Sequence, residues 1–539
     1  MRYTYNVKRK RKERRRAENG ASAPVRTPAV IPMKKIIALT LSALLIFAAL
    51  PLTVFAADGC DCGMAPRIYI EGINCVRMTR DAGTENEKNA FSLEADAIIG
   101  LVQDNKDAIW DMMDANFSAE NEQKVVDAIV SMFDDCSMNP DGTSKYEITT
   151  DFTYPTDDRH KTGNDYTFRY DWRLDPYVLA DQLHSFIEYI KGLTGHDSVH
   201  LIGFSLGTVV LDTYFSVYGY EGIESCVWYC GAYRGVSLVG QLFSGGLYVD
   251  PAALTGFLHE NTENTTAFNL ISALVQGLTD IGITGGITGI VNKVAGKLSS
   301  DGALQEVLLK TFGGMPALWS FVDDDYYQAA KDYIFPTDAE RTEYAGLIEK
   351  IDRYHNEVQL HADEIMENVR AACGKIGVIS KYNSHMTPVV PKADICADSI
   401  IDSYHTSAGA TFAPLGRTLG RDYKQAVDDG HDHLSADGMV DASTCKYPEN
   451  TWFIKNLLHS SNCDYVEDLL RFIAFSDHQV TVFENPEFPQ FGLYSPTTDQ
   501  VVPLTKESDK NADIKFIVKI KAFFQRIFDF IRNLFTIKK

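Results

Sequence analysis

Residues 199–207 read Val-His-Leu-Ile-Gly-Phe-Ser-Leu-Gly, an apolar run that ends in a Gly-x-Ser-x-Gly motif. The run predicts a buried strand over 199–203, and the residues from Thr208 onward predict a helix. A serine at such a strand-to-helix turn occupies a strained position that exposes its hydroxyl, while the flanking glycines let strand and helix pack closely. The motif therefore predicts that Ser205 is a nucleophile, and a purely structural turn is the alternative.

Strands and helices alternate on both sides of this motif. Further strands are expected at 66–72, 166–170, 226–230, 376–380 and 451–454, and helices begin near Pro176 and Tyr465. Such alternation is typical of the α/β class, with a mostly parallel, doubly wound sheet covered by helices on both faces. The sequence therefore predicts one large α/β core.

The alternation stops in the middle of the chain, where helical patterns with glycine-rich interruptions take over. We expect a core in two parts, 57–235 and 373–509, with a largely helical cap or lid inserted at 236–372. Within the insertion, Gly282 to Val291 is rich in glycine and isoleucine. It fits a mobile apolar lid and a buried packing helix equally well.

The amino terminus has the features of a secretory signal. Met33-Lys34-Lys35 precedes an apolar run that ends at Val54-Phe55-Ala56, whose small residues suit cleavage before Ala57. We therefore expect a signal peptide at 33–56 and a protein that is secreted or held at the cell surface. An uncut anchor is the alternative. Residues 1–32 are a basic extension or an over-long start.

Charge argues against a nucleic-acid partner. The whole chain carries a formal charge of -22, and residues 1–56 carry +10, which leaves about -32 for the remainder. So acidic a body repels phosphate backbones.

All ten cysteines follow Ala56, which makes some disulfides plausible in an exported protein. Cys60-Asp61-Cys62 is spaced more tightly than a usual zinc half-site, so we interpret it as a disulfide or as free thiols. No metal and no organic cofactor is expected.

A serine nucleophile needs a base, and the base needs an orienting carboxylate. In this type of fold they follow the serine in the order acid, histidine. Asp437 precedes the expected 451–454 strand and is our predicted acid, with Asp441 as the rival. His459 follows that strand and is the predicted base, with His478 as the alternative. Backbone amides of Ile73 and Leu206 are expected to form the oxyanion hole.

Several segments of the sequence carry a family resemblance. Phe168-Arg-Tyr-Asp-Trp-Arg-Leu-Asp-Pro176, the segment 199–207 and Gly231-Ala-Tyr-Arg-Gly235 together resemble the lecithin:cholesterol acyltransferase family of lipases and acyltransferases. Residues 314–319 and the Asp437-Gly-Met-Val440 segment are also similar to that family. The resemblance implies an α/β-hydrolase core with a lid, acting on acyl esters of lipids. Phe204 and Glu71 depart from the family pattern, which usually has histidine and proline there.

The carboxyl terminus, 510–539, predicts a basic amphipathic helix. Apolar residues recur in steps of four and three from Phe516 to Ile537, and the segment from Lys510 carries eight basic residues against two acidic ones. This pattern is typical of a helix that lies on a membrane surface. A helix docked on the body or on a second copy is the alternative.

Together these features predict an exported serine esterase or lipase that cleaves acyl esters of phospholipids or glycerides through an acyl-serine intermediate. Acyl transfer to an alcohol acceptor uses the same intermediate and is the first alternative. An inactive lipid-binding or cell-surface interaction protein on a hydrolase scaffold is the second.

Overall fold

The computed structural model describes residue 60 and residues 62–92, 95–113, 118–160, 165–260 and 286–510. The predicted extension 1–32, the predicted signal peptide 33–56 and all of the predicted C-terminal helix beyond residue 510 lie outside these ranges. Of the glycine-rich segment 282–291, only residues 286–291 are described.

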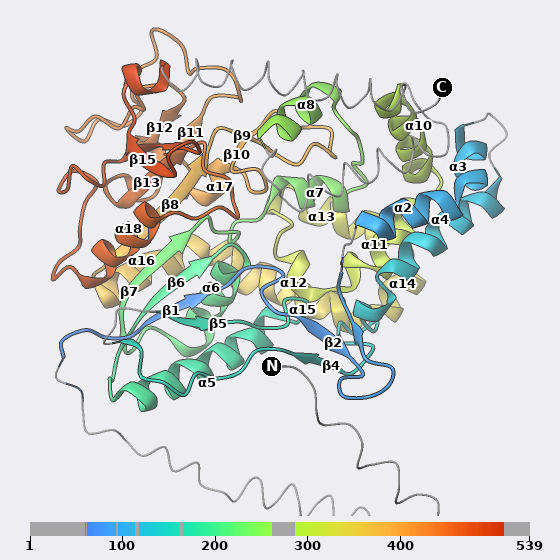
Figure 1. Ribbon diagram of the computed structural model, residues 1–539, viewed down its shortest axis with the longest axis horizontal. Coiled ribbons are helices and arrows are strands. Elements are labelled where there is room, and N and C mark those ends of the chain that lie inside the picture. The colour runs from blue at the N-terminus through green and yellow to red at the C-terminus, as the bar shows by residue number, and fades with distance from the viewer. Residues whose placement is uncertain are drawn as a thin grey trace, which may run out of the picture. The chain divides into compact units, whose positions relative to one another are not determined.

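An eight-stranded sheet forms the centre of the fold (Figure 1). Its strands, in spatial order, are β5 (Tyr166–Phe168), β1 (Arg67–Ile70), β6 (Val199–Phe204), β7 (Ile223–Tyr229), β8 (Ile376–Tyr382), β13 (Thr451–Lys455), β14 (Phe491–Ser495) and β15 (Gln500–Pro503). All neighbouring pairs are parallel except β14 and β15, which are antiparallel. The predicted α/β class with a mostly parallel sheet is confirmed.

Helices cover both faces of this sheet. Along β7, Cys226 and Trp228 point into one apolar core, and the alternate residues Val227 and Tyr229 point into another. The first face is covered by α5 (Pro176–Thr194), α6 (Leu206–Tyr218) and α16 (Ala362–Cys373), and the second by α18 (Asp464–Phe475). Strands buried on both faces explain the near-continuous apolar runs seen in the sequence.

The described part of 236–372 contains helices and no strand. Its α-helices are α7 (Ser237–Phe243), α8 (Pro251–Glu260), α10 (Ile287–Ser300), α11 (Ala303–Lys310), α12 (Pro316–Trp319), α13 (Asp324–Ile334), α14 (Asp338–Glu343), α15 (Ala345–Glu357) and α16. The last of these packs against α6, β7 and β8. This part of the expected insertion therefore belongs to the layer that covers the sheet.

Smaller elements surround the core. Before β5 lie α2 (Ala95–Asp104), α3 (Lys106–Met113), α4 (Ala119–Met132) and a three-stranded sheet of β3 (Lys88–Asn89), β2 (Met78–Arg80) and β4 (Ile148–Thr150). After β8 come β9 (Ser384–His385), β10 (Cys396–Ala397), α17 (Ser403–Thr406), β11 (Thr411–Phe412) and β12 (Val440–Asp441). Within the described ranges, no helix combines the length and the apolar character needed to cross a membrane.

Candidate active site

Ser205 occupies a sharp turn between the end of β6 and the start of α6. Its backbone has φ 54° and ψ -124°, a conformation that costs a non-glycine residue about 1–3 kcal/mol. Surrounding hydrogen bonds hold the turn, because the Ser205 carbonyl accepts from the backbone N–H of Thr208 at 3.0 Å and of Ala232 at 3.2 Å. The strained serine expected from the sequence motif is therefore present.

The two glycines of the motif are required by close packing. A Cβ atom at Gly207 would lie 2.1 Å from the carbonyl oxygen of Ile70 in β1, and one at Gly203 would lie 3.1 Å from the Cα atom of Thr208. Helix α6 can thus approach β1 and β6 only where side chains are missing. This close approach fixes the position of Ser205 above the sheet.

His459 reaches Ser205 from a distant loop. It follows β13, and its Nε2 atom lies 3.0 Å from the Ser205 hydroxyl oxygen. The Phe204 ring stacks on the imidazole at a centroid distance of 5.0 Å. The predicted base is therefore adjacent to the predicted nucleophile, and Phe204 packs against the predicted base.

A buried lysine holds the His459 loop. Lys381, in β8, donates from Nζ to the carbonyl oxygens of Leu458, His459 and Ser461 at 3.1, 2.9 and 2.6 Å. Burial lowers the pKa of its ammonium group. Three carbonyl acceptors compensate part of the cost of burying this side chain and fix the loop that carries the base.

The carboxylate that contacts the predicted base, His459, is Asp398. Its Oδ2 atom lies 2.7 Å from His459 Nδ1, and its Oδ1 atom accepts from the backbone N–H groups of Ile400 and Ile401. Asp398 follows β10, in the loop after β8. Since β8 and β13 are adjacent parallel strands, their carboxyl ends bring the acid and the base together.

The sequence-based choice of Asp437 was therefore wrong. Asp437 pairs with Lys455 at 3.0 Å and accepts from the Tyr382 hydroxyl at 3.0 Å. Its rival Asp441 accepts from the backbone N–H of Ser443, as a turn-capping aspartate does. The alternative base, His478, is 58% exposed and pairs with Asp477 and Glu484.

Two aspartate turns in this part of the chain are locally alike, which explains the error. In each, the aspartate accepts from the N–H two residues on, and the intervening residue has positive φ: 95° at Ser399 and 70° at Gly438. Glycine favours that backbone conformation, so Asp437-Gly438 is the more conspicuous turn in the sequence. The sequence signal that favours Asp398 is its position, because it follows the 376–380 strand much more closely than Asp437 does.

One predicted oxyanion donor, Leu206, directly follows Ser205, and the other, Ile73, lies in the loop after β1. Leu206 is buried and begins α6, so its N–H belongs to the helix amino terminus, where N–H groups lack intrahelical partners. Ile73 follows Gly72, and a Cβ at Gly72 would lie 2.9 Å from the Ser205 Cβ. The loop after β1 thus packs against the nucleophile, and Ile73 remains a prediction for the second donor.

A cavity of about 340 Å³ opens beside His459. Tyr69, Phe204 and Tyr229 line it together with Glu71 and Glu467. Burial raises the pKa of the Glu71 carboxyl, and nearby Arg169 opposes that rise. With Asp165, three acidic residues line this cavity and make it unfavourable for an anionic group.

Within the described ranges, two groups of side chains have the composition of metal ligands. Cys230, Asp398 and His459 form the first, which coincides with the acid and base just described. Cys60, Cys62, His160 and His196 form the second, at the other end of the sheet. No local pattern in the sequence connects these cysteines with a histidine, because His160 and His196 lie about 100 and 134 residues away.

No protein-family model, curated protein or solved structure matches this chain.

Proposed function

We propose that this protein is a serine hydrolase of the α/β-hydrolase type that cleaves acyl esters. One observation carries the proposal: Ser205 Oγ, His459 Nε2, His459 Nδ1 and Asp398 Oδ2 form a continuous chain of contacts at 3.0 and 2.7 Å. A nucleophile, a base and an orienting acid in this geometry define the serine-hydrolase triad, whatever the fold.

Each group has a defined role in the reaction. His459 Nε2 accepts the proton of Ser205 as its oxygen attacks the ester carbonyl, and Asp398 holds the imidazole with Nδ1 protonated. The same proton then passes from Nε2 to the departing alcohol. Water then attacks the acyl-serine with the same help from His459, which releases the carboxylic acid and restores the Ser205 hydroxyl. The Leu206 N–H stabilises the oxyanion, with Ile73 as the second expected donor.

The position of the site supports a hydrolase rather than a structural role for these residues. Strand β1 lies between β5 and β6, so the strand order reverses at β1, and Ser205 follows the carboxyl end of β6. Ligands of open α/β sheets bind outside the carboxyl ends at such a reversal. An inactive scaffold would have no need for the strained backbone of Ser205.

Lipid acyl esters are the proposed substrate class. The support is the sequence resemblance to lecithin:cholesterol acyltransferases and the apolar, basic 510–539 segment, which suits a lipid surface. The proposed location is outside the cell or on its surface, as the 33–56 segment predicts. Acyl transfer to an alcohol remains the alternative outcome, since it differs only in which molecule attacks the acyl-serine.

A fluorophosphonate probe and an ester series test the proposal. The purified protein should be labelled at Ser205 and hydrolyse p-nitrophenyl esters, whereas Ser205→Ala should show neither. His459→Ala should lose hydrolysis by several orders of magnitude, and His478→Ala, a matched change at an exposed histidine, should not. Equal labelling of the wild type and Ser205→Ala would refute the assignment. Products from phosphatidylcholine vesicles with and without an added long-chain alcohol would separate hydrolysis from transfer.

A further inference from the structure

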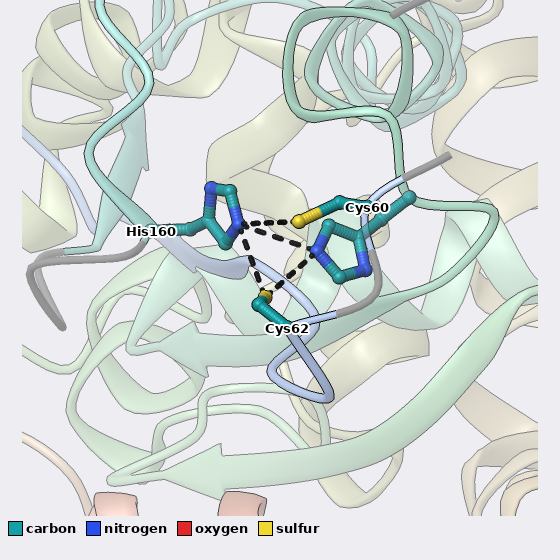
Figure 2. A group of neighbouring side chains, drawn as sticks. Cys60, Cys62 and His160 are labelled. Carbon is teal, nitrogen blue, oxygen red and sulfur yellow. Dashed lines mark hydrogen bonds between the residues drawn. The ribbon is translucent and has the colours of Figure 1, made fainter. Parts of the chain in front are cut away.

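Four potential metal ligands meet at the end of the sheet opposite Ser205. Cys60 and Cys62 precede β1, His160 precedes β5, and His196 precedes β6. These three strands are adjacent and parallel, so their amino ends meet at one edge. Figure 2 shows the side chains of Cys60, Cys62 and His160 converging on one point.

The ligand-atom distances that involve His160 or join Cys62 to His196 are close to those around a tetrahedral zinc ion, and all four atoms lie within 4.8 Å of one another. Zn–S bonds of about 2.3 Å and Zn–N bonds of about 2.0–2.1 Å at tetrahedral angles place two nitrogens about 3.3 Å apart and a nitrogen and a sulfur about 3.6 Å apart. The two Nε2 atoms of His160 and His196 are 3.2 Å apart. The Cys62 Sγ lies 3.5 Å from the first and 3.4 Å from the second, and the Cys60 Sγ lies 3.8 Å from His160 Nε2.

The surroundings prepare His160 as a ligand. Its Nδ1 atom contacts the carboxylate of Asp158, which fixes the proton on Nδ1 and leaves the Nε2 lone pair directed at the cysteines. Metal-bound histidines almost always have such a partner. The ring of His160 is buried. A buried imidazole lone pair that faces two sulfurs and a second imidazole is well explained by a shared cation.

The backbone holds the other ligands in place. The N–H of Cys60 donates to the carbonyl of Gly195 at 2.9 Å. Gly195 is the residue before His196 and ends α5 with φ 70°. The segment that carries the cysteines is therefore attached to the turn that carries the second histidine.

We propose that Cys60, Cys62, His160 and His196 form a structural zinc site. Two thiolates and two imidazoles are a typical set for this ion, and two thiolates balance its charge. Four protein ligands leave no open position for water or substrate, and the site lies at the amino ends of strands whose carboxyl ends carry the nucleophile. The ion ties the segment before β1 to the starts of β5 and β6, which stabilises the fold and takes no part in ester cleavage.

Metal analysis and cobalt substitution test the site on the full-length protein. Protein purified under reducing conditions without chelators should contain one zinc per chain. After the zinc is stripped, added Co²⁺ should give the intense d–d bands of tetrahedral cobalt and a thiolate charge-transfer band. Stripping should lower Tm and leave the rate of ester hydrolysis unchanged well below that Tm.

Two ligand variants have matched controls. Cys62→Ser and His196→Ala should lose zinc and the tetrahedral cobalt spectrum. Cys373→Ser and His361→Ala should retain both, since these residues lie outside the cluster and contact Lys375 and Glu364 instead. Reduced wild-type protein that binds neither zinc nor cobalt would overturn the proposal, and so would a Cys60–Cys62 disulfide in protein that binds no metal after reduction. Zinc content and the cobalt spectrum do not depend on ester hydrolysis, so the zinc site and the proposed hydrolase activity can be refuted separately.

Discussion

His459 and Asp398 are joined by two hydrogen bonds, one through side chains and one through the backbone. The imidazole Nδ1 lies 2.7 Å from the Asp398 carboxylate, and the backbone N–H of His459 donates to the Asp398 carbonyl, also at 2.7 Å. The loops after β8 and β13 are thereby fixed to each other. The ring can rotate little without breaking the side-chain contact, so it stays aimed at Ser205.

Replacing each of the two candidate acids, Asp398 and Asp437, by asparagine should separate their roles. We expect Asp398→Asn to lower kcat for a short chromogenic ester by about 10³–10⁴-fold, because the amide no longer holds the productive imidazole tautomer. Asp437→Asn should leave kcat within a few-fold of wild type and lower Tm, since it weakens the buried contact with Lys455. The reverse pattern would return the catalytic role to Asp437.

Lys381→Met should impair His459 indirectly, through the loop that carries it. The change leaves the carbonyls of Leu458, His459 and Ser461 without their shared donor, so the loop that carries the imidazole loses its anchor. We expect kcat to fall at least about tenfold with a smaller change in KM, together with a lower Tm. An unchanged kcat in folded Lys381→Met would show that the loop needs no such anchor.

Gly207→Ala and Gly296→Ala should affect stability in opposite directions. The new methyl group at 207 would collide with the Ile70 carbonyl at 2.1 Å, which forces α6 away from β1. At Gly296 in α10 nothing lies within 4 Å of the new Cβ, and alanine stabilises a helix by up to about 1 kcal/mol relative to glycine. Denaturant unfolding of both variants checks this. Similar stability for the two variants would mean that the Ser205 turn can relax to accommodate the methyl group at position 207.

Asp212 should make the protein less stable as pH rises. Burial raises the pKa of this carboxyl to about 8, although Trp228 donates to it at 2.8 Å. In the unfolded chain the group loses its proton near pH 4. Between these values the folded state binds more protons, so the free energy of unfolding falls with pH by up to about 1.4 kcal/mol per unit.

Asp212→Asn removes that dependence while keeping an acceptor for Trp228. The stability difference between the variant and the wild type should be small near pH 4 and grow in favour of the variant up to pH 8. Urea unfolding at each pH measures it. A constant difference across this range would mean that the Asp212 carboxyl titrates at its ordinary value.

Removing residues 511–539 should abolish binding to anionic vesicles and spare hydrolysis of a soluble ester. The cut follows Lys510 so that Asp509, which pairs with Lys455 at 2.5 Å, is retained. Attraction to vesicles should weaken with salt, since basic residues contribute to it. Unchanged vesicle binding, or aggregation with loss of soluble activity, would instead make the segment part of the body.

Local patterns in the sequence were sufficient for the class of fold and for choosing two of the three residues of the proposed triad. The apolar runs around Val199 and Ile376 predicted strands, because a strand buried on both faces needs a continuous apolar stretch. Ser205 was recognisable because its turn requires small neighbours at fixed positions. His459 was chosen as the base because it follows 451–454, the last strand that the sequence predicted.

Only the tertiary structure decided which aspartate faces the base and that two cysteines meet two histidines. Asp398 and Asp437 adopt similar local turns, so their chemistry differs only through the position of each turn relative to β8 and β13. Cys62 and His196 are 134 residues apart and meet because β1 and β6 are neighbours in the sheet. Strand order depends on packing between distant segments, and no local pattern of residues records it.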